Sequence, residues 1–430
     1  MRGLARVLIR VFFRRVEIEW EDRVPAHGPV LVVANHTNGL VDGLLLMAML
    51  RRFPRFLGKS TLFKIPPLWP FLKLAGVIPV YRAMDGTPTS RNTSAFATSE
   101  RLLARESVVA IFPEGVSHDE ASVQPLRTGA ARIALDAAAD GGTIPVVAVG
   151  LIYDDKSIFR SRALVRVGEP MWVSQGAGEG EAGRAAVRQL TESIARRLGE
   201  VSPPYSSWAQ ADELALVADV VVRPVGQGLH TDVALADRTA TAERLATLDD
   251  QAHLQPTFAA LRSAFAAYRR DLDLLGLTDG QVATRYASGA LRRSVLRSLI
   301  KVVVAVPFAV LGFVVHVLPF QIVKQLAARS SNEGIKATIK LLGCFVLFFV
   351  TYVLVGVLVG RSFGAWWGLA AALASPLCGY VSVRLFERVR RIDGLLEGFH
   401  TMRERGTVIE SVLVDRQRVV DAARVVLSSP

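Results

Sequence analysis

The chain has 430 residues, with 51 lysines and arginines against 39 acidic residues and a formal charge of +12. This length allows two or more domains, and this charge is typical of proteins that bind nucleic acid, anionic membranes or phosphorylated substrates. Long uncharged segments in the last third of the chain favour the membrane and argue against nucleic acid. Both cysteines, Cys344 and Cys378, lie inside those segments, which argues against a disulfide framework, a cysteine zinc site and a thiol nucleophile.

Residues 1–16 predict an amphipathic helix at the membrane surface. Arginine recurs at every fourth position, and apolar side chains occupy the opposite side: Arg2, Arg6, Arg10 and Arg14 against Leu4, Val7, Leu8, Val11 and Phe12. The apolar side can lie among acyl chains while the arginines reach anionic head groups. A signal peptide would have an uninterrupted apolar centre. The alternative is a helix that packs on the protein's own domain.

Residues 17–201 alternate short β-branched runs with helical patterns rich in alanine and leucine, which predicts an α/β domain. We expect strands at residues 30–34, 77–81, 108–112, 144–153 and 164–167, and helices at residues 40–50, 98–105, 129–139 and 184–198. The basic, aromatic and proline-rich stretch at residues 52–73 suits the membrane-facing rim of a site that admits an acyl chain. The alternative for this stretch is a loop that covers the core.

A proline pair at residues 203–204 marks the end of this domain. Residues 202–297 then predict a helical region, with amphipathic helices at residues 208–222 and 241–275. We find no set of residues there that indicates chemistry.

The predicted membrane region covers residues 298–384. Within it, residues 341–360 and 362–383 each carry no charged side chain and are long enough to span a hydrocarbon core of about 30 Å. We expect residues 298–323 to be re-entrant or interfacial, because only then do all basic clusters stay on the cytoplasmic side. Glycines suited to close packing flank the hairpin turn: Gly356, Gly360, Gly364 and Gly368. These patterns predict an integral membrane protein, in the cell membrane if bacterial, with the α/β domain on the cytoplasmic face and a cytoplasmic helical tail at residues 385–430.

The stretch at residues 29–46 is the most informative. A buried strand run ends in a polar turn that carries His36, and Asp42 follows at the start of an apolar helical run. In α/β sheets such strand ends are where ligands bind. A carboxylate on one imidazole nitrogen fixes the tautomer and stabilises the protonated ring, so the pair predicts a general base and its orienting carboxylate. The alternative is a turn histidine and a helix-capping aspartate.

Three further stretches follow in order: residues 76–82, a strand that delivers one arginine; residues 112–115, reading FPEG; and residues 144–150, an apolar strand that begins with proline. Together with His36 and Asp42, they resemble the four blocks of the glycerolipid acyltransferase family over roughly the first 200 residues. The usual NHxxxxD block has four residues between histidine and aspartate, whereas this chain has five, and Gly39 is the place to absorb the extra one. The pattern resembles the branch that acylates glycerol 3-phosphate or dihydroxyacetone phosphate.

The resemblance implies a mixed sheet flanked by helices, with an N-terminal interfacial helix, a helical insert and a C-terminal transmembrane hairpin added to it. It also implies acyl transfer in phospholipid biosynthesis, from a coenzyme A or acyl-carrier-protein thioester to glycerol 3-phosphate, dihydroxyacetone phosphate or lysophosphatidate, without a metal or other cofactor. Arg82 would then bind the acceptor phosphate and Glu114 a glycerol hydroxyl, while Gly115 permits close approach. Lys59 and Arg127 are further phosphate candidates, or only surface charges.

The resemblance also places Pro145 on the acyl-donor side of the site. Two other functions stay open: an inactive lipid-binding protein on the same scaffold, and a metal-dependent hydrolase. The metal ligands would come from five acidic and histidine side chains: His36, Asp42, Glu114, His118 and Asp119. A base that activates the acceptor makes an acyl-enzyme unnecessary, and Ser117 is the one rival nucleophile near these blocks.

Overall fold

The computed structural model describes residues 1–66, 68–81, 92–139, 142–156, 158–226, 232–284, 286, 288–330 and 333–429. The chain divides into two compact units. The first, called here the α/β unit, comprises Met1–Pro204 and Val323–Val346. The second, called the helical unit, comprises Tyr205–Ile322 and Leu347–Pro430.

The α/β unit is built on a mixed sheet that has eight strands among the described residues. They are β1 (Arg15–Glu19), β2 (Val30–Ala34), β3 (Pro54–Lys59), β4 (Ile78–Val80), β5 (Val108–Ile111), β6 (Ile144–Tyr153), β7 (Arg162–Val167) and β8 (Met171–Val173). Their order is β1-β7-β6-β2-β5-β3-β4, with β8 beside β6. β6 runs antiparallel to β7 and β8, and the other pairs are parallel. The five predicted strands are confirmed, and β1, β3 and β8 are additional.

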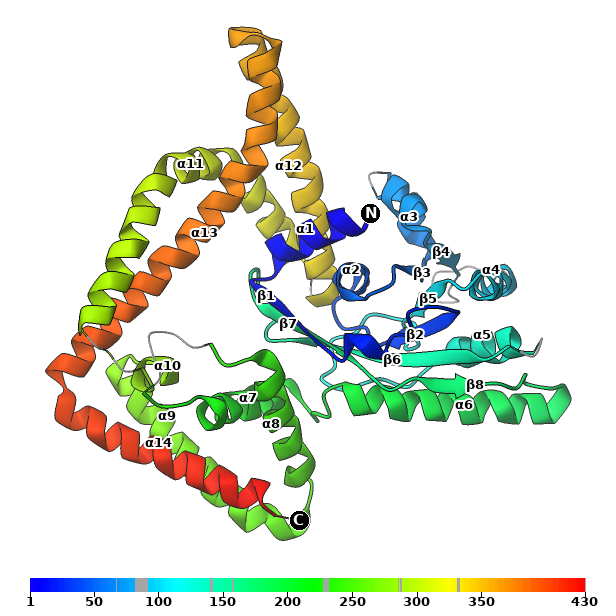
Figure 1. The fold of residues 1–430 in the computed structure, drawn as a ribbon, viewed down its shortest axis with the longest axis horizontal. Coiled ribbons are helices and arrows are strands. Elements are labelled where there is room, and N and C mark those ends of the chain that lie inside the picture. Colours follow the sequence, from blue (N-terminus) through cyan, green and yellow to red (C-terminus); the bar gives the residue numbers. More distant parts are fainter. Residues whose placement is uncertain are drawn as a thin grey trace. The chain divides into compact units, whose positions relative to one another are not determined.

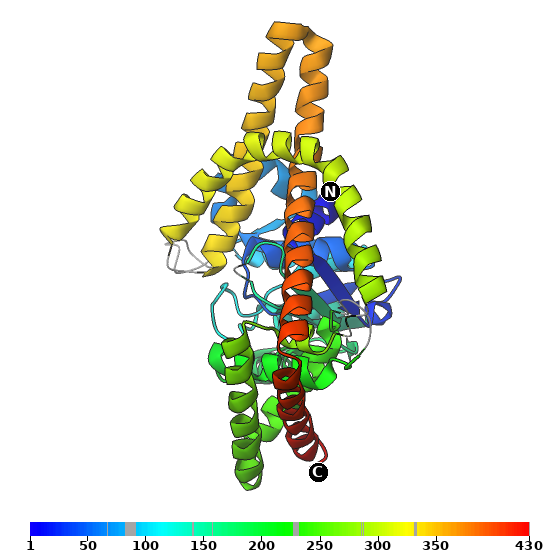
Figure 2. The same ribbon diagram turned by 90° about the vertical axis from the view of Figure 1, so that its left-hand side faces the viewer.

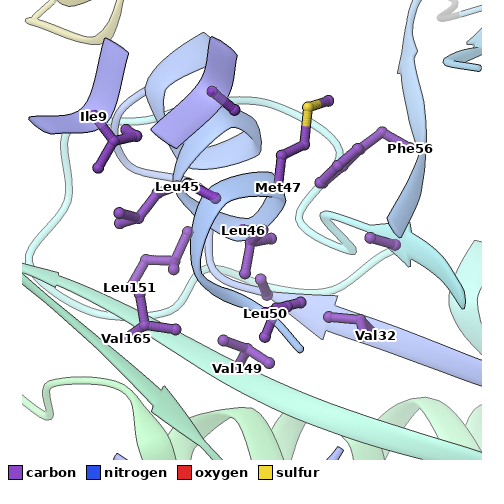
Figure 3. Packing of buried hydrophobic residues seen from close by; sticks show 14 of the residues in the cluster. Ile9, Val32, Leu45, Leu46, Met47, Leu50, Phe56, Val149, Leu151 and Val165 are labelled. Atoms are coloured by element: carbon purple, nitrogen blue, oxygen red, sulfur yellow. The ribbon is translucent and has the colours of Figure 1, made fainter. Parts of the chain in front are cut away.

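Helices cover both faces of the sheet, which explains why its central strands are apolar throughout. The helices are α1 (Arg2–Phe12) and α2 (Leu40–Met49) on one face, and α4 (Asn92–Ala104), α5 (Gly129–Ala138) and α6 (Gly180–Val201) on the other (Figure 1). All five residues of β2 are buried. Figure 3 shows the core on the face that α1 and α2 cover, where Leu46 and Leu50 lie over Val32 of β2 and Val149 of β6. Each such buried leucine contributes about 1.5–3 kcal/mol.

The parallel pairing of β2 with β5 and β6 brings three parts of the chain to one edge of the sheet. They are the segment after β2, the segment after β5 and the last residues of β6. The Asn35 side chain fixes the exit from β2, because its Nδ2 donates to the Leu151 carbonyl at 3.0 Å and its Oδ1 accepts from the Leu151 N–H at 2.7 Å. This edge is therefore where the candidate residues meet.

The N-terminal helix α1 packs on the α/β unit through much of its apolar surface. Ala5, Ile9 and Phe12 are buried in the core that α2 covers. The prediction that the apolar side of α1 lies in lipid is wrong for Phe12. The side of α1 that carries Ala5, Ile9 and Phe12 packs on the protein's own domain, as the alternative states. Val7 and Val11 are 56% and 38% exposed, so a second, outward strip keeps the residue types that a membrane surface needs.

Two of the α1 arginines bond to the end of α2. Arg6 Nε donates to the Ala48 carbonyl at 3.1 Å, and Arg2 donates to the Leu50 carbonyl. The last carbonyls of a helix lack partners within it and carry a partial negative charge, so both contacts stabilise the end of α2. The prediction that every α1 arginine reaches a lipid head group is wrong for these two.

Residues 52–73 are not a loop. They form β3, the short helix η2 (Ser60–Lys64) and most of α3 (Trp69–Ala75). β3 lies between β5 and β4 and buries Phe56. On α3, Leu72 is buried while Trp69 and Leu74 are exposed. Lys73 Nζ lies over the Trp69 ring, 5.2 Å from the ring centroid. The prediction of a membrane-facing rim stays a prediction, with α3 as its surface.

The helical unit contains α7 (Trp208–Val222), α8 (Leu235–Asp249), η5 (Ala252–Leu254), α9 (Gln255–Leu275), α10 (Asp279–Val282) and α14 (Gly406–Leu427). The prediction of a single helix at residues 241–275 is wrong, because helix α8 ends at Asp249 and helix α9 begins at Gln255. Pro256 lies in the first turn of α9, where its missing N–H costs nothing.

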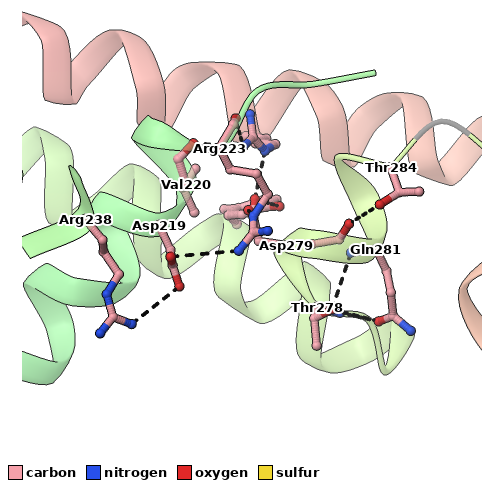
Figure 4. Close-up of polar contacts among 11 residues, drawn as sticks. Asp219, Val220, Arg223, Arg238, Thr278, Asp279, Gln281 and Thr284 are labelled. Atoms are coloured by element: carbon pink, nitrogen blue, oxygen red, sulfur yellow. Dashed lines mark hydrogen bonds and ion pairs between the residues drawn. The ribbon is translucent and has the colours of Figure 1, made fainter. Parts of the chain in front are cut away.

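An ionic cluster with little exposed surface joins α14 to the rest of the helical unit. Asp279 accepts from Arg416 Nε at 2.7 Å, from Arg223 Nε at 2.8 Å and from the Tyr268 hydroxyl at 2.9 Å. Figure 4 shows Arg223 and Asp279 in this cluster. Arg416, from α14, also donates to the Val220 carbonyl at 2.8 Å. The last helix of the helical tail predicted at residues 385–430 is thus an integral part of the helical unit, and the cytoplasmic location of this tail stays a prediction.

Among the described residues, three helices are long and apolar enough to span a membrane. They are α11 (Ser288–Ala328), α12 (Glu333–Phe363) and α13 (Ala365–Glu404). Figures 1 and 2 both show α11 as an arch that bends in its middle and turns back. Pro307 and Pro319 lie inside it, and each removes a backbone donor and favours a kink. The re-entrant course predicted for residues 298–323 stays a prediction, and the arch has the shape that it requires.

α12 and α13 form the expected tight hairpin. Gly364 separates them with a φ of +97°, a conformation that favours glycine. A Cβ added at Gly368 would lie 2.4 Å from the Gly356 carbonyl oxygen, so the two backbones are in direct contact. Helix α11 joins this pair through a hydrogen bond of 2.7 Å between His316 Nε2 and the Tyr352 hydroxyl.

Candidate active site

The structure brings His36 and Asp42 together at the edge of the sheet. His36 lies in the turn after β2 and Asp42 in the first turn of α2, with 2.8 Å between Nδ1 and Oδ2. The Asp42 side chain is fully buried and that of His36 is 13% exposed. Because a carboxylate can only accept, Nδ1 carries the proton and Nε2 the lone pair. The N-cap of α2 is Gly39, so Asp42 is not the helix cap that the alternative required.

Two more donors hold the Asp42 carboxylate. The Asn38 N–H donates to Oδ2 at 2.8 Å, and the Tyr153 hydroxyl donates to Oδ1. Burial, followed by the negative charge of Asp42, raises the pKa of Tyr153 well above its ordinary value of about 10. Tyr153 is therefore protonated at neutral pH and acts as a donor. Both carboxylate oxygens are thus fixed, and with them the orientation of the His36 ring.

Gly39 closes the turn between the two residues. Its φ of +56° lies in the region that glycine favours, as expected of the position that absorbs the longer spacing. Its N–H donates to Ser117 Oγ at 3.1 Å. Ser117, predicted as a turn residue or a rival nucleophile, therefore fastens this turn to the segment after β5.

Glu114 is a buried carboxylate that connects the same two segments. Its Oε1 accepts from the His36 N–H at 2.7 Å, and its Oε2 accepts from the Gln124 N–H at 2.8 Å and contacts His118 Nε2. The His36 ring in turn stacks on Phe112 of the same segment, with 4.1 Å between ring centroids. The predicted contact of Glu114 with a glycerol hydroxyl stays a prediction, and in this structure both oxygens are engaged by the protein.

The region that contains His36, Asp42 and Glu114 matches a family of known proteins. Residues 15–152 match the family model described as Acyltransferase. These residues form an acyltransferase domain of the glycerolipid acyltransferase family. The match contains β1 to β5, nearly all of β6, the His36 turn and the Glu114 segment.

Two relatives from yeast are named for an activity. Glycerol-3-phosphate O-acyltransferase 2 of Saccharomyces cerevisiae is 28% identical over 285 residues, covering 61% of this chain and 37% of the relative. Glycerol-3-phosphate O-acyltransferase 1 of the same yeast is 34% identical over 113 residues, covering 25% and 15%. The matched part is thus well under two thirds of either relative. A solved structure, the 1-acyl-sn-glycerophosphate acyltransferase PlsC from Thermotoga maritima, is 18% identical with a TM-score of 0.34, covering 46% of this chain and 77% of that one.

The predicted acceptor-binding residues of the acyltransferase domain lie at different places. Gly115 has a φ of +80°, and a Cβ there would lie 3.2 Å from Arg127 Cγ, so the Arg127 side chain lies against the FPEG turn. Lys59 is the last residue of β3, beside Val80 of β4. Arg82 lies outside the described residues. The phosphate-binding role of these three cations stays a prediction.

Pro145 is placed away from the other blocks. It is the second residue of β6 and pairs with Trp172 of β8, whereas Tyr153 ends the same strand at the His36 edge. Eight residues of strand separate the two by about 26 Å. The prediction that Pro145 supports the acyl-donor side stays a prediction, and the residue lies at the other end of β6 from Tyr153.

The metal alternative gains no support from the described part of the chain, where no group of three histidine, cysteine, aspartate or glutamate side chains is arranged to hold a metal ion. Asp119, one of the suggested ligands, forms an ion pair with Lys156. His118 contacts Glu114, as described above.

Tyr153 is the site residue that sequence reasoning missed. It was expected as the last residue of a strand, with no role in chemistry. Asp42 is 111 positions away in sequence, and only the pairing of β6 with β2 brings the two together. A tyrosine at the carboxyl end of an otherwise aliphatic strand was the available signal.

Proposed function

We propose that the chain is a membrane-bound O-acyltransferase of phospholipid biosynthesis. It would move a fatty acyl group from a coenzyme A or acyl-carrier-protein thioester to a hydroxyl of glycerol 3-phosphate, dihydroxyacetone phosphate or lysophosphatidate. The observation that carries this proposal is the 2.8 Å contact between His36 Nδ1 and Asp42 Oδ2 inside an acyltransferase domain. The names of the yeast relatives support glycerol 3-phosphate as the first acceptor to test.

In the proposed mechanism, His36 Nε2 takes the proton of the acceptor hydroxyl while the hydroxyl oxygen attacks the thioester carbonyl carbon. The tetrahedral intermediate collapses, the carbon–sulfur bond breaks, and the leaving thiolate takes the proton back from His36. The products are an ester and a free thiol, and no acyl-enzyme forms. Asp42 holds the ring in the required tautomer and offsets the charge of the imidazolium. General-base catalysis of this kind is worth about 10² to 10⁴ in rate.

The turn after β2 offers one donor for the negative charge on the carbonyl oxygen. The N–H groups of His36, Asn38 and Gly39 each donate to a side chain of the protein. The Thr37 N–H has no hydrogen-bond partner among the residues that the structure describes. We assign this group as the oxyanion donor, because a fixed backbone N–H next to the base is the usual form of such a site.

The acceptor phosphate would bind to one or more of the predicted cations. Arg82 is the first candidate, since its planar guanidinium can bind a phosphate with two parallel hydrogen bonds. Lys59 and Arg127 are the others. Replacement Arg82→Ala should raise the KM for the acceptor far more than the KM for the acyl donor. Equal effects on both would assign Arg82 to the donor or to folding.

The proposal is tested by incubating the purified full-length chain with labelled acyl-CoA or acyl carrier protein and a panel of acceptors. Wild type should form an ester with a phosphorylated glycerol acceptor. His36→Ala and Asp42→Asn should fold, bind membranes and lose transfer, while Cys344→Ala/Cys378→Ala should stay active. Wild-type turnover by folded His36→Ala would refute the mechanism. A stoichiometric acyl adduct in intact-protein mass spectrometry, formed with donor alone and removed by acceptor, would show an acyl-enzyme instead.

The chain associates with the membrane through its long apolar helices. We propose that α12 and α13 cross it and that α11 enters and leaves on one side, which keeps the α/β unit cytoplasmic. The arch of α11 and the tight turn at Gly364 support this topology. Labelling of single cysteines introduced at Ser330 and at Gly364 should place these positions on opposite sides of the membrane. Labelling from the same side would exclude it.

A further inference from the structure

The buried carboxylate of Asp42 has two oxygens with different partners. Oδ2 faces His36 Nδ1 and the Asn38 N–H, while Oδ1 faces the Tyr153 hydroxyl. The Asp42 side chain has no exposed surface, so solvent cannot replace a donor that is lost. Without Tyr153, Oδ1 would lose its donor, the carboxylate would be held through Oδ2 only, and it could rotate about its Cβ–Cγ bond.

Tyr153 is itself held rigidly. Its ring stacks on Phe13 with 5.8 Å between centroids and 23° between planes. Phe13 is buried and directly follows the last residue of α1. Arg160 holds this junction, because its Nη1 donates to the Arg10 carbonyl at 2.6 Å and to the Phe13 carbonyl at 2.8 Å. The Tyr153 backbone belongs to β6, paired with Ala163 of β7. The hydroxyl is therefore fixed before any substrate binds.

We propose that Tyr153 is a positioning residue for the His36–Asp42 pair, and that the junction after α1 supports it through Phe13. The proposal rests on the proposed function, because it assigns to Tyr153 a share in the base strength and orientation of His36. The Tyr153 hydroxyl holds Asp42 Oδ1, so that Asp42 Oδ2 faces His36 Nδ1. The direction of His36 Nε2 is thereby fixed. A hydrogen bond to an ionised group is short and directional, which suits it to this task.

Replacement Tyr153→Phe keeps the ring and its stacking on Phe13 and removes only the hydroxyl. By comparison with groups that orient metal-bound histidines, the loss in kcat should be on the order of 10- to 100-fold. The KM values of donor and acceptor should stay within about twofold, because Tyr153 does not contact either substrate in the proposed mechanism.

The helical unit offers a matched control. Tyr268 is buried, and its hydroxyl also donates to an aspartate, Asp279, at 2.9 Å; the Asp279 side chain is 12% exposed. Tyr268→Phe removes the same kind of bond from a cluster with no role in the proposed chemistry. It should lower the thermal unfolding midpoint and leave kcat unchanged. An equal loss of kcat in both variants would show that the effect follows from stability and would overturn the proposal.

The decisive measurement is kcat in four forms of the full-length chain in detergent: wild type, Tyr153→Phe, Asp42→Asn and the double variant. If Tyr153 acts through Asp42, adding Tyr153→Phe to Asp42→Asn should change the residual rate by less than about twofold. The same fold loss in both backgrounds would overturn the proposal. If Tyr153→Phe does not fold, Phe13→Leu, which weakens the stacking and keeps the hydroxyl, must show the same pattern.

The outcomes separate this proposal from the proposed function. An active wild type, an inactive His36→Ala and a fully active Tyr153→Phe would refute only the role of Tyr153. A wild type that transfers no acyl group with any donor or acceptor would overturn both.

Discussion

Replacing Glu114 with glutamine should loosen the turn that carries His36 rather than weaken the binding of an acceptor. In the wild type, Oε1 accepts from the His36 N–H at 2.7 Å and Oε2 from the Gln124 N–H at 2.8 Å, in a side chain without exposed surface. Glutamine has a single oxygen, so one of these N–H groups must face the amide nitrogen. A buried donor without a partner costs about 1–3 kcal/mol, and the surviving bond loses about 1 kcal/mol because its acceptor is neutral. The free energy of unfolding should fall by about 2–4 kcal/mol.

The assay combines denaturant unfolding of the full-length chain in detergent with steady-state kinetics. Glu114→Gln should be less stable and have a lower kcat, with the KM for the acceptor nearly unchanged. The matched control is Glu120→Gln on the same segment, whose side chain is exposed. This replacement should change the free energy of unfolding by less than about 0.5 kcal/mol. Unchanged stability of Glu114→Gln together with a raised acceptor KM would refute this reasoning and return Glu114 to the substrate-binding role.

Three further outcomes can be measured on the same protein. Gly150→Ala should lower the free energy of unfolding by about 3 kcal/mol or more, because a Cβ there would lie 1.9 Å from a carbonyl oxygen of α6; denaturant unfolding checks this. Gly368→Val should separate α12 from α13 and lower the thermal midpoint in detergent, whereas Leu369→Val, at a 51% exposed neighbour, should not. The raised pKa of Tyr153 means that the folded state keeps a proton which the unfolded state loses above about pH 10, so the contribution of Tyr153 to stability should be constant below this pH and fall above it. Unfolding of Tyr153→Phe across this range should show a smaller fall.

The parts of the fold that the sequence predicts well are those with an unmixed local signal. Residues 144–153 are an unbroken apolar run, and β6 has these same bounds. β3 was missed because Arg55 and Lys59 interrupt its apolar pattern; both are only partly buried, in a strand next to the edge strand β4. The buried side of α1 was not distinguished from its outward side, because both carry valine, leucine or isoleucine and the sequence does not show which side meets α2.

In the candidate site, too, the sequence predicts local contacts well and contacts that depend on the fold poorly. His36 and Asp42 are six positions apart, so the spacing alone indicates that they can meet. The contact of Asp42 with Tyr153 depends on which strands are neighbours in the sheet, which no local pattern shows. Glu114 was expected to bind an acceptor because the resemblance to the family implies this role, and its partners in the fold are not visible in the sequence. Two of its partners are backbone N–H groups, which every residue but proline has and which leave no trace in the residue types.

The discontinuity of the α/β unit has a consequence for how the protein is made. Residues 323–346 belong to it: Leu341 packs against its core, and Phe345 meets Phe71 of α3 edge-on at 5.1 Å. At about 5–20 residues per second, synthesis of the intervening Tyr205–Ile322 takes on the order of ten seconds. During this interval the nascent first 204 residues lack the packing that Leu341 and Phe345 supply. The α/β unit can therefore be completed only after Tyr205–Ile322 and the start of α12 have been synthesised.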